Sequence, residues 1–183
     1  APKPSLAFTR APSEIKPWYG PTRGFSFNRE VQPVLDRHCV GCHDGRGGTP
    51  NFVRRADIHP TIPNMKTLTH TRFPPAYLEL RRYVRAATME SDLRGLPPYE
   101  FHADASKVVQ LLNKGHYGVK LDAESWDRLI TWIDLNTPAQ GTWHEIVGSQ
   151  FVDHQRDRRR ELLKRYAGVD EDPEATIETA RWQ

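Results

Sequence analysis

The stretch Cys39-Val40-Gly41-Cys42-His43 decides the fold of this chain of 183 residues, and it holds both of the chain's cysteines. Cys-X-X-Cys-His is the spacing of covalent c-type haem attachment, in which the cysteines form thioether bonds and the histidine binds the iron. Two intervening residues place both sulfurs along one edge of the porphyrin, and the adjacent residue can turn its imidazole under the iron. The motif therefore predicts one covalent haem c on Cys39 and Cys42, with His43 as the proximal iron ligand.

Two other interpretations of the cysteines stay open. A redox-active dithiol has the same spacing, but it usually lies at the start of a helix that follows a strand, and no strand pattern precedes Cys39. A zinc site needs about four ligands, so histidines would have to complete it in the absence of a second cysteine pair. The adjacent His43 favours haem, which would leave no cysteine for a disulfide.

The composition is consistent with a globular domain whose core is partly filled by a cofactor. Hydrophobic residues make up 37% of the chain, which also has 15 prolines, so we expect a thin side-chain core and long irregular loops. The formal net charge of +3 is too small to indicate nucleic-acid binding. No apolar run reaches the roughly 18 residues of a membrane span. Because bacteria attach haem c outside the cytoplasm, we expect a periplasmic or otherwise exported protein whose signal is not in this chain.

Helical patterns surround the motif. Apolar residues from Phe27 to Leu35 recur at helical spacing, and Pro33 should lie near the first turn or at a kink. Further helices are expected from Pro75 to Arg85, from an Asp104 cap to Gly115, from an Asp122 cap to Asn136, and from Arg156 to Tyr166. In the third of these, Trp126, Leu129, Ile130 and Ile133 form the apolar stripe.

These patterns divide the chain into three parts. Residues 1–24 form a proline-rich arm, which we expect to wrap on the domain through Trp18 and Tyr19. Residues 25–147 form the haem domain, and residues 148–183 form a charged helical tail or linker, in which the acidic segment 170–174 is expected to be a linker.

The order of a helix, Cys-X-X-Cys-His, a long loop and a tryptophan-containing terminal helix resembles the class I cytochrome c fold. The segment 126–133 is similar to the terminal helix of that fold, which crosses the first helix and closes the haem pocket. The chain is more similar still to the C-terminal haem domain of hydrazine synthase alpha-subunit-like proteins. The resemblance covers residues 25–143 and is carried by segments 25–35, 39–43, 115–121, 126–136 and 141–143.

The resemblance implies a mainly α fold, with long loops and extended terminal arms, around a single bis-histidine haem. It also implies two haems in the hydrazine synthase alpha subunit, one catalytic and one for electron transfer. This chain has one Cys-X-X-Cys-His, which matches the non-catalytic haem. Hydrazine chemistry is therefore not transferred to this protein, and no catalytic residue is assigned.

The distal iron ligand is predicted to be His116. Class I cytochromes usually place a methionine on the loop before the terminal helix, but this chain has Gly115-His116-Tyr117-Gly118 there. The flanking glycines allow a close approach to the porphyrin. Tyr117 and Trp126 are expected to pack against the ring or a propionate. The alternatives that stay open are an open or water-bound iron and ligation by one of five other residues: His59, Met65, His70, Met89 or His102.

Two axial protein ligands predict an electron-transfer module rather than an enzyme. A second histidine in place of methionine should give a lower reduction potential than in a His/Met cytochrome c. The expected partner is another redox protein, or another redox domain of a parent polypeptide. The alternatives are a peroxidase or nitrogen-compound oxidoreductase with Arg94, Tyr99 or His102 over an open iron, and a redox or gas sensor with a displaceable His116.

Overall fold

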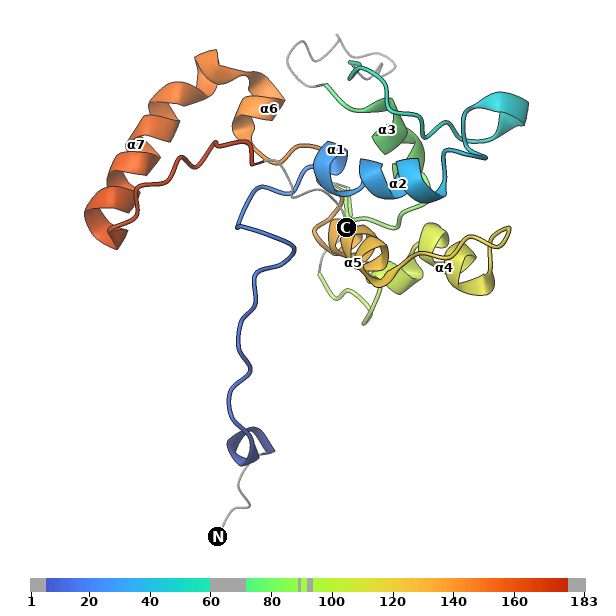
Figure 1. Ribbon diagram of the computed structural model, residues 1–183, viewed down its shortest axis with the longest axis horizontal. Helices are drawn as coiled ribbons and strands as arrows, with labels where there is room; N and C mark the ends of the chain where they lie inside the picture. Colours follow the sequence, from blue (N-terminus) through green and yellow to red (C-terminus); the bar gives the residue numbers. More distant parts are fainter. Residues whose placement is uncertain (1–5, 60–71, 89, 92–93, 178–183) are drawn as a thin grey trace.

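The computed structural model describes residues 6–59, 72–88, 90–91 and 94–177, and it is mainly helical. Strand-like pairing in these residues is limited to two isolated antiparallel bridges, Asp44 with Asn51 and Ile58 with Phe73. No helix in these ranges is long and apolar enough to cross a membrane. The elements in chain order are η1 (Leu6–Thr9), α1 (Phe27–Glu30), α2 (Gln32–His38), η2 (Arg46–Gly48), α3 (Pro75–Arg81), η3 (Ala103–Ala105), α4 (Lys107–Lys114), α5 (Ala123–Asp134), α6 (Trp143–Val147) and α7 (Ser149–Ala167) (Figure 1).

The helices α3, α4 and α5 begin and end within a few residues of the predicted bounds, whereas α7 begins at Ser149 instead of Arg156 and α6 was not predicted. The helix before the haem motif is split at Val31 into α1 and α2, and Pro33 lies in the first turn of α2, where its missing N–H is tolerated. Asp122 caps α5 by accepting a hydrogen bond of 2.8 Å from the Ser125 N–H. Gly115 ends α4 with a φ of +95°. The prediction of Asp104 as a cap is wrong, because it lies inside η3 and Ser106 is the N-cap residue of α4.

Three aromatic side chains form the centre of the core, where α1, α3 and α5 meet. The ring centroids of Phe27 and Trp132 are 5.4 Å apart, and Tyr77 lies 5.5 Å from Phe27 and 6.0 Å from Trp132. Trp132 Nε1 donates a hydrogen bond of 3.0 Å to the Pro138 carbonyl, and the Tyr77 hydroxyl donates one of 3.0 Å to the Thr137 carbonyl. The terminal helix α5 therefore packs on the first helix, as predicted.

The buried face of α5 differs from the predicted stripe. Leu129, Trp132 and Ile133 are buried, whereas Trp126 is only partly buried. The centre of the face also contains Arg128, which is 1% exposed. Hydropathy alone assigns an arginine to the exposed side of a helix. The sequence pattern therefore centred the predicted buried face of this helix too close to Trp126.

A buried carboxylate explains why Arg128 lies inside. Glu30 of α1 is 0% exposed and pairs with the Arg128 guanidinium through Oε2. It also accepts hydrogen bonds from Arg23, at 2.6 Å to Nε and 3.0 Å to Nη2. Glu124, one turn before Arg128, accepts a 2.8 Å bond from its Nε. Two carboxylates thus neutralise two guanidiniums at the crossing of α1 and α5.

In its described part, the N-terminal arm contacts the domain near its C-terminal end. Residues 10–17 are exposed and run away from the helices (Figure 1). Trp18 and Tyr19 then cover Arg128, whose guanidinium carbon is 5.2 Å and 5.1 Å from their ring centroids, and the Tyr19 hydroxyl donates to Asp127. The predicted contact through these two aromatic residues is confirmed, but residues 10–17 do not wrap on the domain.

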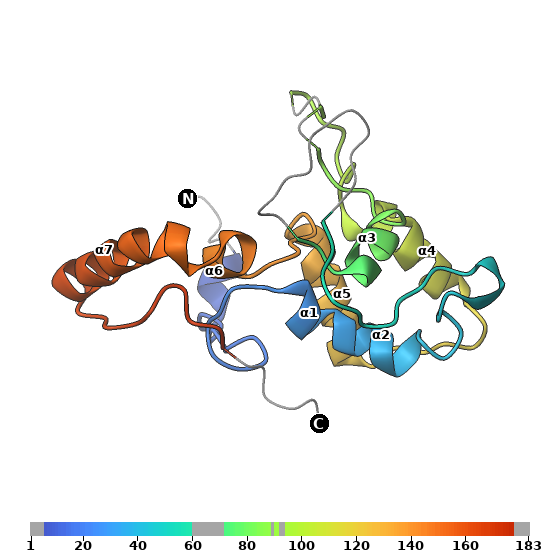
Figure 2. The same cartoon turned by 90° about the horizontal axis from the view of Figure 1, so that it is seen from above.

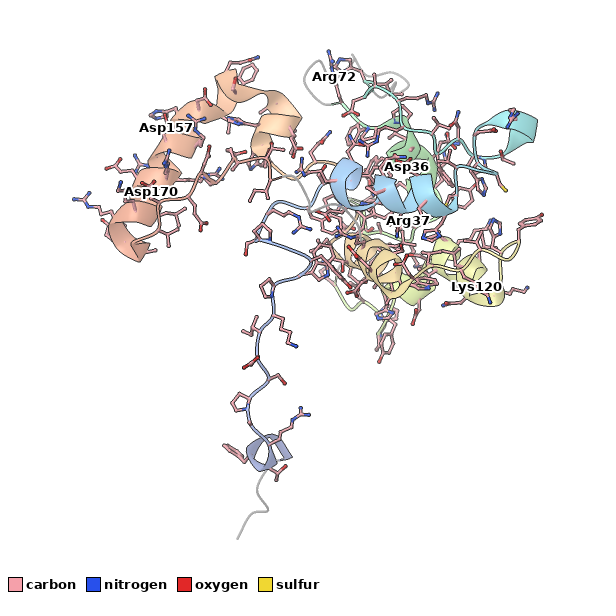
Figure 3. All side chains as sticks on the ribbon, in the orientation of Figure 1. Asp36, Arg37, Arg72, Lys120, Asp157 and Asp170 are labelled. Atoms are coloured by element: carbon pink, nitrogen blue, oxygen red, sulfur yellow. The ribbon has the colours of Figure 1, made fainter. Side chains whose placement is uncertain are left out.

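The C-terminal part forms a hairpin beside the α1–α5 group. Helices α6 and α7 project away from that group in both views (Figures 1 and 2). The acidic segment expected to be a linker instead folds back along α7, where Asp170 accepts bonds of 2.7 Å from Arg160 and 2.9 Å from Lys164 (Figure 3). Glu174 is 3% exposed and pairs with Arg159.

Among the described residues, two contacts attach this hairpin to the domain. The backbones of Gly24 and Gly141 touch so closely that a Cβ on Gly24 would overlap the Gly141 carbonyl oxygen. Glu145 of α6 pairs with Arg29 of α1 and accepts backbone bonds of 2.8 Å from Gly141 and 2.9 Å from Thr142. Thr142 completes a capping box with Glu145 at the start of α6.

Candidate cofactor site

An apolar cavity opens beside the Cys-X-X-Cys-His motif, between α2, α3, α4 and α5. Its volume is about 480 Å³, within the range of pockets that hold organic cofactors. Cys39, Cys42, His43 and His116 all line it. The apolar part of the wall comprises Val34, Leu35, Pro50, Phe52, Leu80, Val108, Leu111, Leu112, Val119, Leu121 and Leu129.

The motif reaches the cavity because it continues directly from α2. The Cys39 N–H bonds the Leu35 carbonyl at 2.8 Å, and the His43 N–H bonds the Cys39 carbonyl at 2.9 Å, so the chain keeps turning after the helix ends. The backbone then pairs with the segment after the glycine-rich loop, since the Phe52 N–H donates to the His43 carbonyl at 2.8 Å. This pairing fixes the backbone of His43 on both sides.

His43 and His116 face each other across the cavity. Their ring centroids are 5.8 Å apart and their planes are inclined by 16°. Imidazole nitrogens bind metals at about 2 Å, which places the centres of two rings on one metal about 6 Å apart. The observed separation is close to this distance, and the two predicted ligands, far apart in the chain, border the same cavity with their ring planes nearly parallel.

The environment of His43 favours its neutral, metal-binding form. Burial lowers the pKa of His43 below its usual value, and the nearby His116 lowers it further, while the Pro50 carbonyl raises it. The Nδ1 atom of His43 is buried and makes no hydrogen bond of normal geometry.

The two cysteines line the same cavity and are not joined in a disulfide. Burial raises the pKa of Cys39 to about 11, so its thiolate is scarce at neutral pH. Redox-active dithiols instead have a cysteine with a lowered pKa. The environment of Cys39 is therefore unlike that of a thiol–disulfide exchange site.

Only some of the other residues predicted to contact the cofactor line the cavity. Tyr117 lines it, although the side chain is 95% exposed, and Trp126 is not among the lining residues. His102 and His59 also lie outside the lining: His102 accepts a bond from the Asp104 N–H, and His59 accepts one from Arg72. Met65, His70 and Met89 lie outside the described residues.

Sequence reasoning missed two lining side chains. His38, which precedes Cys39 in the sequence, forms part of the wall, while its Nε2 lies 3.2 Å from the Ser125 Oγ and 3.5 Å from the Asp122 carboxylate. Tyr83 follows α3 and was not considered. The periodicity of α2 and the end of α3 were the signals that could have placed both at the cavity.

Among the described residues, no group of three or more His, Cys, Asp or Glu side chains is arranged to hold a metal ion. A porphyrin brings its own nitrogen ligands, so two facing histidines are the protein contribution that a six-coordinate haem requires. Comparison with family models, curated proteins and solved structures gives no match to this chain. The site is therefore interpreted from its own residues.

Proposed function

We propose that this protein is a monohaem c-type cytochrome domain, with a class I cytochrome c-like fold, that transfers single electrons. The observation that carries the proposal is that the Cys-X-X-Cys-His motif borders an apolar cavity with a second histidine opposite the first, at a ring separation of 5.8 Å. Cys39 and Cys42 would hold the haem covalently, with His43 and His116 as axial ligands. When bound, the haem supplies an iron that alternates between ferric and ferrous states.

The residues around the cavity support electron transfer over catalysis. With both axial positions held by histidines, a substrate has no free position on the metal. Two imidazoles, without a thioether sulfur, stabilise the oxidised state and give a low reduction potential. The partner in this proposal is another redox protein or redox domain, and the location is outside the bacterial cytoplasm, where haem c is attached.

The first experiment tests attachment. We expect the chain produced with haem-maturation machinery to carry one covalent haem by intact mass after acid denaturation. The optical spectrum should be low-spin and six-coordinate in both oxidation states. A bare polypeptide mass would overturn the proposal, and a high-spin spectrum that binds carbon monoxide at rest would favour a catalytic or sensing haem.

Variants of the distal histidine test the ligand assignment. His116→Ala should convert the haem to a high-spin form that binds carbon monoxide, and His116→Met should keep six coordination and raise the reduction potential. His102→Ala is the matched control, because this loop histidine lies outside the cavity lining and should leave the spectrum unchanged. Silence of both alanine variants would place the distal ligand elsewhere.

A further inference from the structure

His38 is an imidazole in the cavity wall to which the proposed function gives no role. It is the last residue of α2, and its side chain is 15% exposed. Its Nε2 lies 3.2 Å from the Ser125 Oγ and 3.5 Å from a carboxylate oxygen of Asp122, whose side chain is 45% exposed. The His38 ring therefore borders both the cavity and a carboxylate that solvent reaches.

The hydrogen bonds around Ser125 determine which ring nitrogen of His38 can gain a proton. The Ser125 hydroxyl donates its hydrogen to the Asp122 carboxylate at 3.0 Å, so its oxygen can only accept from the imidazole. Nε2 therefore carries a hydrogen in the neutral ring, and Nδ1 is the nitrogen that can take up a second one.

Two charged groups lie beside this imidazole. The hydrogen bond from the Ser125 N–H, 2.8 Å long, does most to lower the pKa of Asp122, and the Ser125 hydroxyl and Arg37 lower it further against the opposing effect of burial. Asp122 is therefore ionised near neutral pH and stabilises the protonated form of His38. The Arg37 guanidinium, labelled on α2 in Figure 3, opposes it.

Other ionisable groups near His38 have different partners or titrate in another range. The Asp36 carboxylate of α2 accepts from Gln32, and the Glu124 carboxylate of α5 accepts from Arg128. The proposed function uses the cysteines and the two facing histidines of the cavity, and phenols ionise only near pH 10. Among the described residues that line the cavity, His38 is thus the side chain left to change its charge between about pH 5 and 8. The remaining ionisable side chains of the wall are Cys39, Cys42, His43, Tyr83, His116 and Tyr117.

A purely structural role would need less than this arrangement provides. The hydrogen bond to Ser125 requires only a neutral donor, which an amide side chain could supply. A titratable ring in an apolar wall instead responds to the charge of whatever fills the cavity, because charges interact strongly where water is excluded. One electron added in the cavity therefore stabilises the imidazolium form of His38, and by reciprocity the imidazolium stabilises the added electron.

We propose that His38 couples electron transfer at this site to the uptake of a proton. As an electron enters the cofactor from the redox partner, neutral His38 binds a proton from solvent at Nδ1, and it releases that proton to solvent when the electron leaves. This inference rests on the proposed haem function and goes beyond it, since it makes the reduction potential depend on pH through one named side chain.

The test compares ferric and ferrous haem-loaded protein between about pH 5 and 8. We expect His38 to bind its proton about fivefold more tightly in the ferrous state, the lower end of the usual coupling between two sites. The reduction potential should fall with rising pH by the same factor, which corresponds to about 40 mV at roughly 59 mV per tenfold. NMR titration of the His38 ring protons in each oxidation state measures the factor without an electron-transfer assay. Equal proton affinities, or a potential that does not change with pH, would overturn the inference.

A matched pair of variants identifies the group that takes the proton. His38→Gln keeps a hydrogen-bonding side chain beside Ser125 but does not titrate, so the potential should become independent of pH in this range. His144 is the control, because its Nε2 also lies close to a carboxylate, 2.9 Å from Asp153, but outside the cavity lining. His144→Gln should leave the pH dependence unchanged. A dependence that survives His38→Gln would belong to the carboxylates of the haem itself and would contradict the inference.

A second variant covers the case in which His38→Gln does not fold. Asparagine is as good an N-cap as aspartate, so Asp122→Asn keeps the start of α5 and removes the charge that favours the imidazolium form of His38. The fall in potential should then occur at lower pH, and an unmoved midpoint would count against the inference. Failure of the wild-type chain to take up haem would instead refute the proposed function, so the two failures are distinguishable.

Discussion

Replacing Glu30 by glutamine changes one oxygen of the carboxylate to an NH₂ group. This change should lower the free energy of unfolding more than a change of this kind at any other charged residue. The Glu30 carboxylate is 0% exposed and accepts three hydrogen bonds, two from Arg23 and one from Arg128. Glutamine keeps one acceptor oxygen and turns an NH₂ group toward a guanidinium. Two arginines whose side chains are only 4% and 2% exposed then share one fewer negative charge.

The size of the effect follows from burial. Breaking a buried ion pair by removing one partner costs about 3–5 kcal/mol, because the remaining charge stays out of water. Arg128→Met should cost less, about 1–3 kcal/mol, since Glu30 keeps both bonds from Arg23 and the partly exposed Glu124 can return to solvent. Loss of the contacts of Arg128 with Trp18 and Tyr19 adds to this cost.

The two substitutions together form a double-mutant cycle. If Glu30 is the charge that allows Arg128 to be buried, the double variant should cost less than the sum of the single variants by about 1 kcal/mol or more. Urea denaturation followed by circular dichroism measures each free energy of unfolding on haem-loaded protein. A cost below about 1 kcal/mol for Glu30→Gln, or strict additivity, would refute the reasoning.

Two further predictions concern the contacts that attach the C-terminal hairpin. Burial raises the pKa of Glu145, but hydrogen bonds from Arg29 and the backbone lower it by more, so the folded pKa lies below the usual value. The ionised Glu145 carboxylate therefore stabilises the folded state at pH values above its unfolded pKa of about 4.3. This stabilisation is lost as the pH falls through the lower pKa of the folded state. Glu145→Gln should therefore reduce the difference in unfolding free energy between neutral and acidic pH, and an unchanged difference would contradict the assignment. Gly24→Ala should lower the free energy of unfolding by about 1–3 kcal/mol, because its Cβ would overlap the Gly141 carbonyl.

The sequence predicted the parts of the fold and site that depend on local patterns. A five-residue motif placed two thiols and an imidazole at one wall of the cavity, and the helical spacing of Leu35 and Leu129 predicted the helices that contribute its apolar lining. Asp122 and Gly115 marked helix ends because capping and left-handed backbone are local requirements. His116 was found by its place between two glycines.

The features that were missed depend on partners far apart in the chain. Arg128 is buried because Glu30 lies 98 residues earlier, and Gln32 is buried because it reaches the backbone of Phe52. In each case the residue type alone indicates exposure, and the compensating charge or carbonyl cannot be located from periodicity. The same limit explains why the acidic segment after α7 was expected to be a linker.

These missed residues also explain how so apolar a cavity can exist between short helices. Arg128 and Leu129 are adjacent on α5, so they point about 100° apart around the helix axis, one toward Glu30 and the other into the cavity. On α2, Gln32 and Leu35 are one turn apart on the same side of the helix, so the bond from Gln32 to the Phe52 carbonyl lies next to the cavity wall that Leu35 and Phe52 both line. Buried polar contacts therefore hold the helices in position and leave the wall of the cavity apolar. An apolar lining that had to set the helix positions by itself would collapse on the cavity, since nothing but a bound cofactor would resist closure.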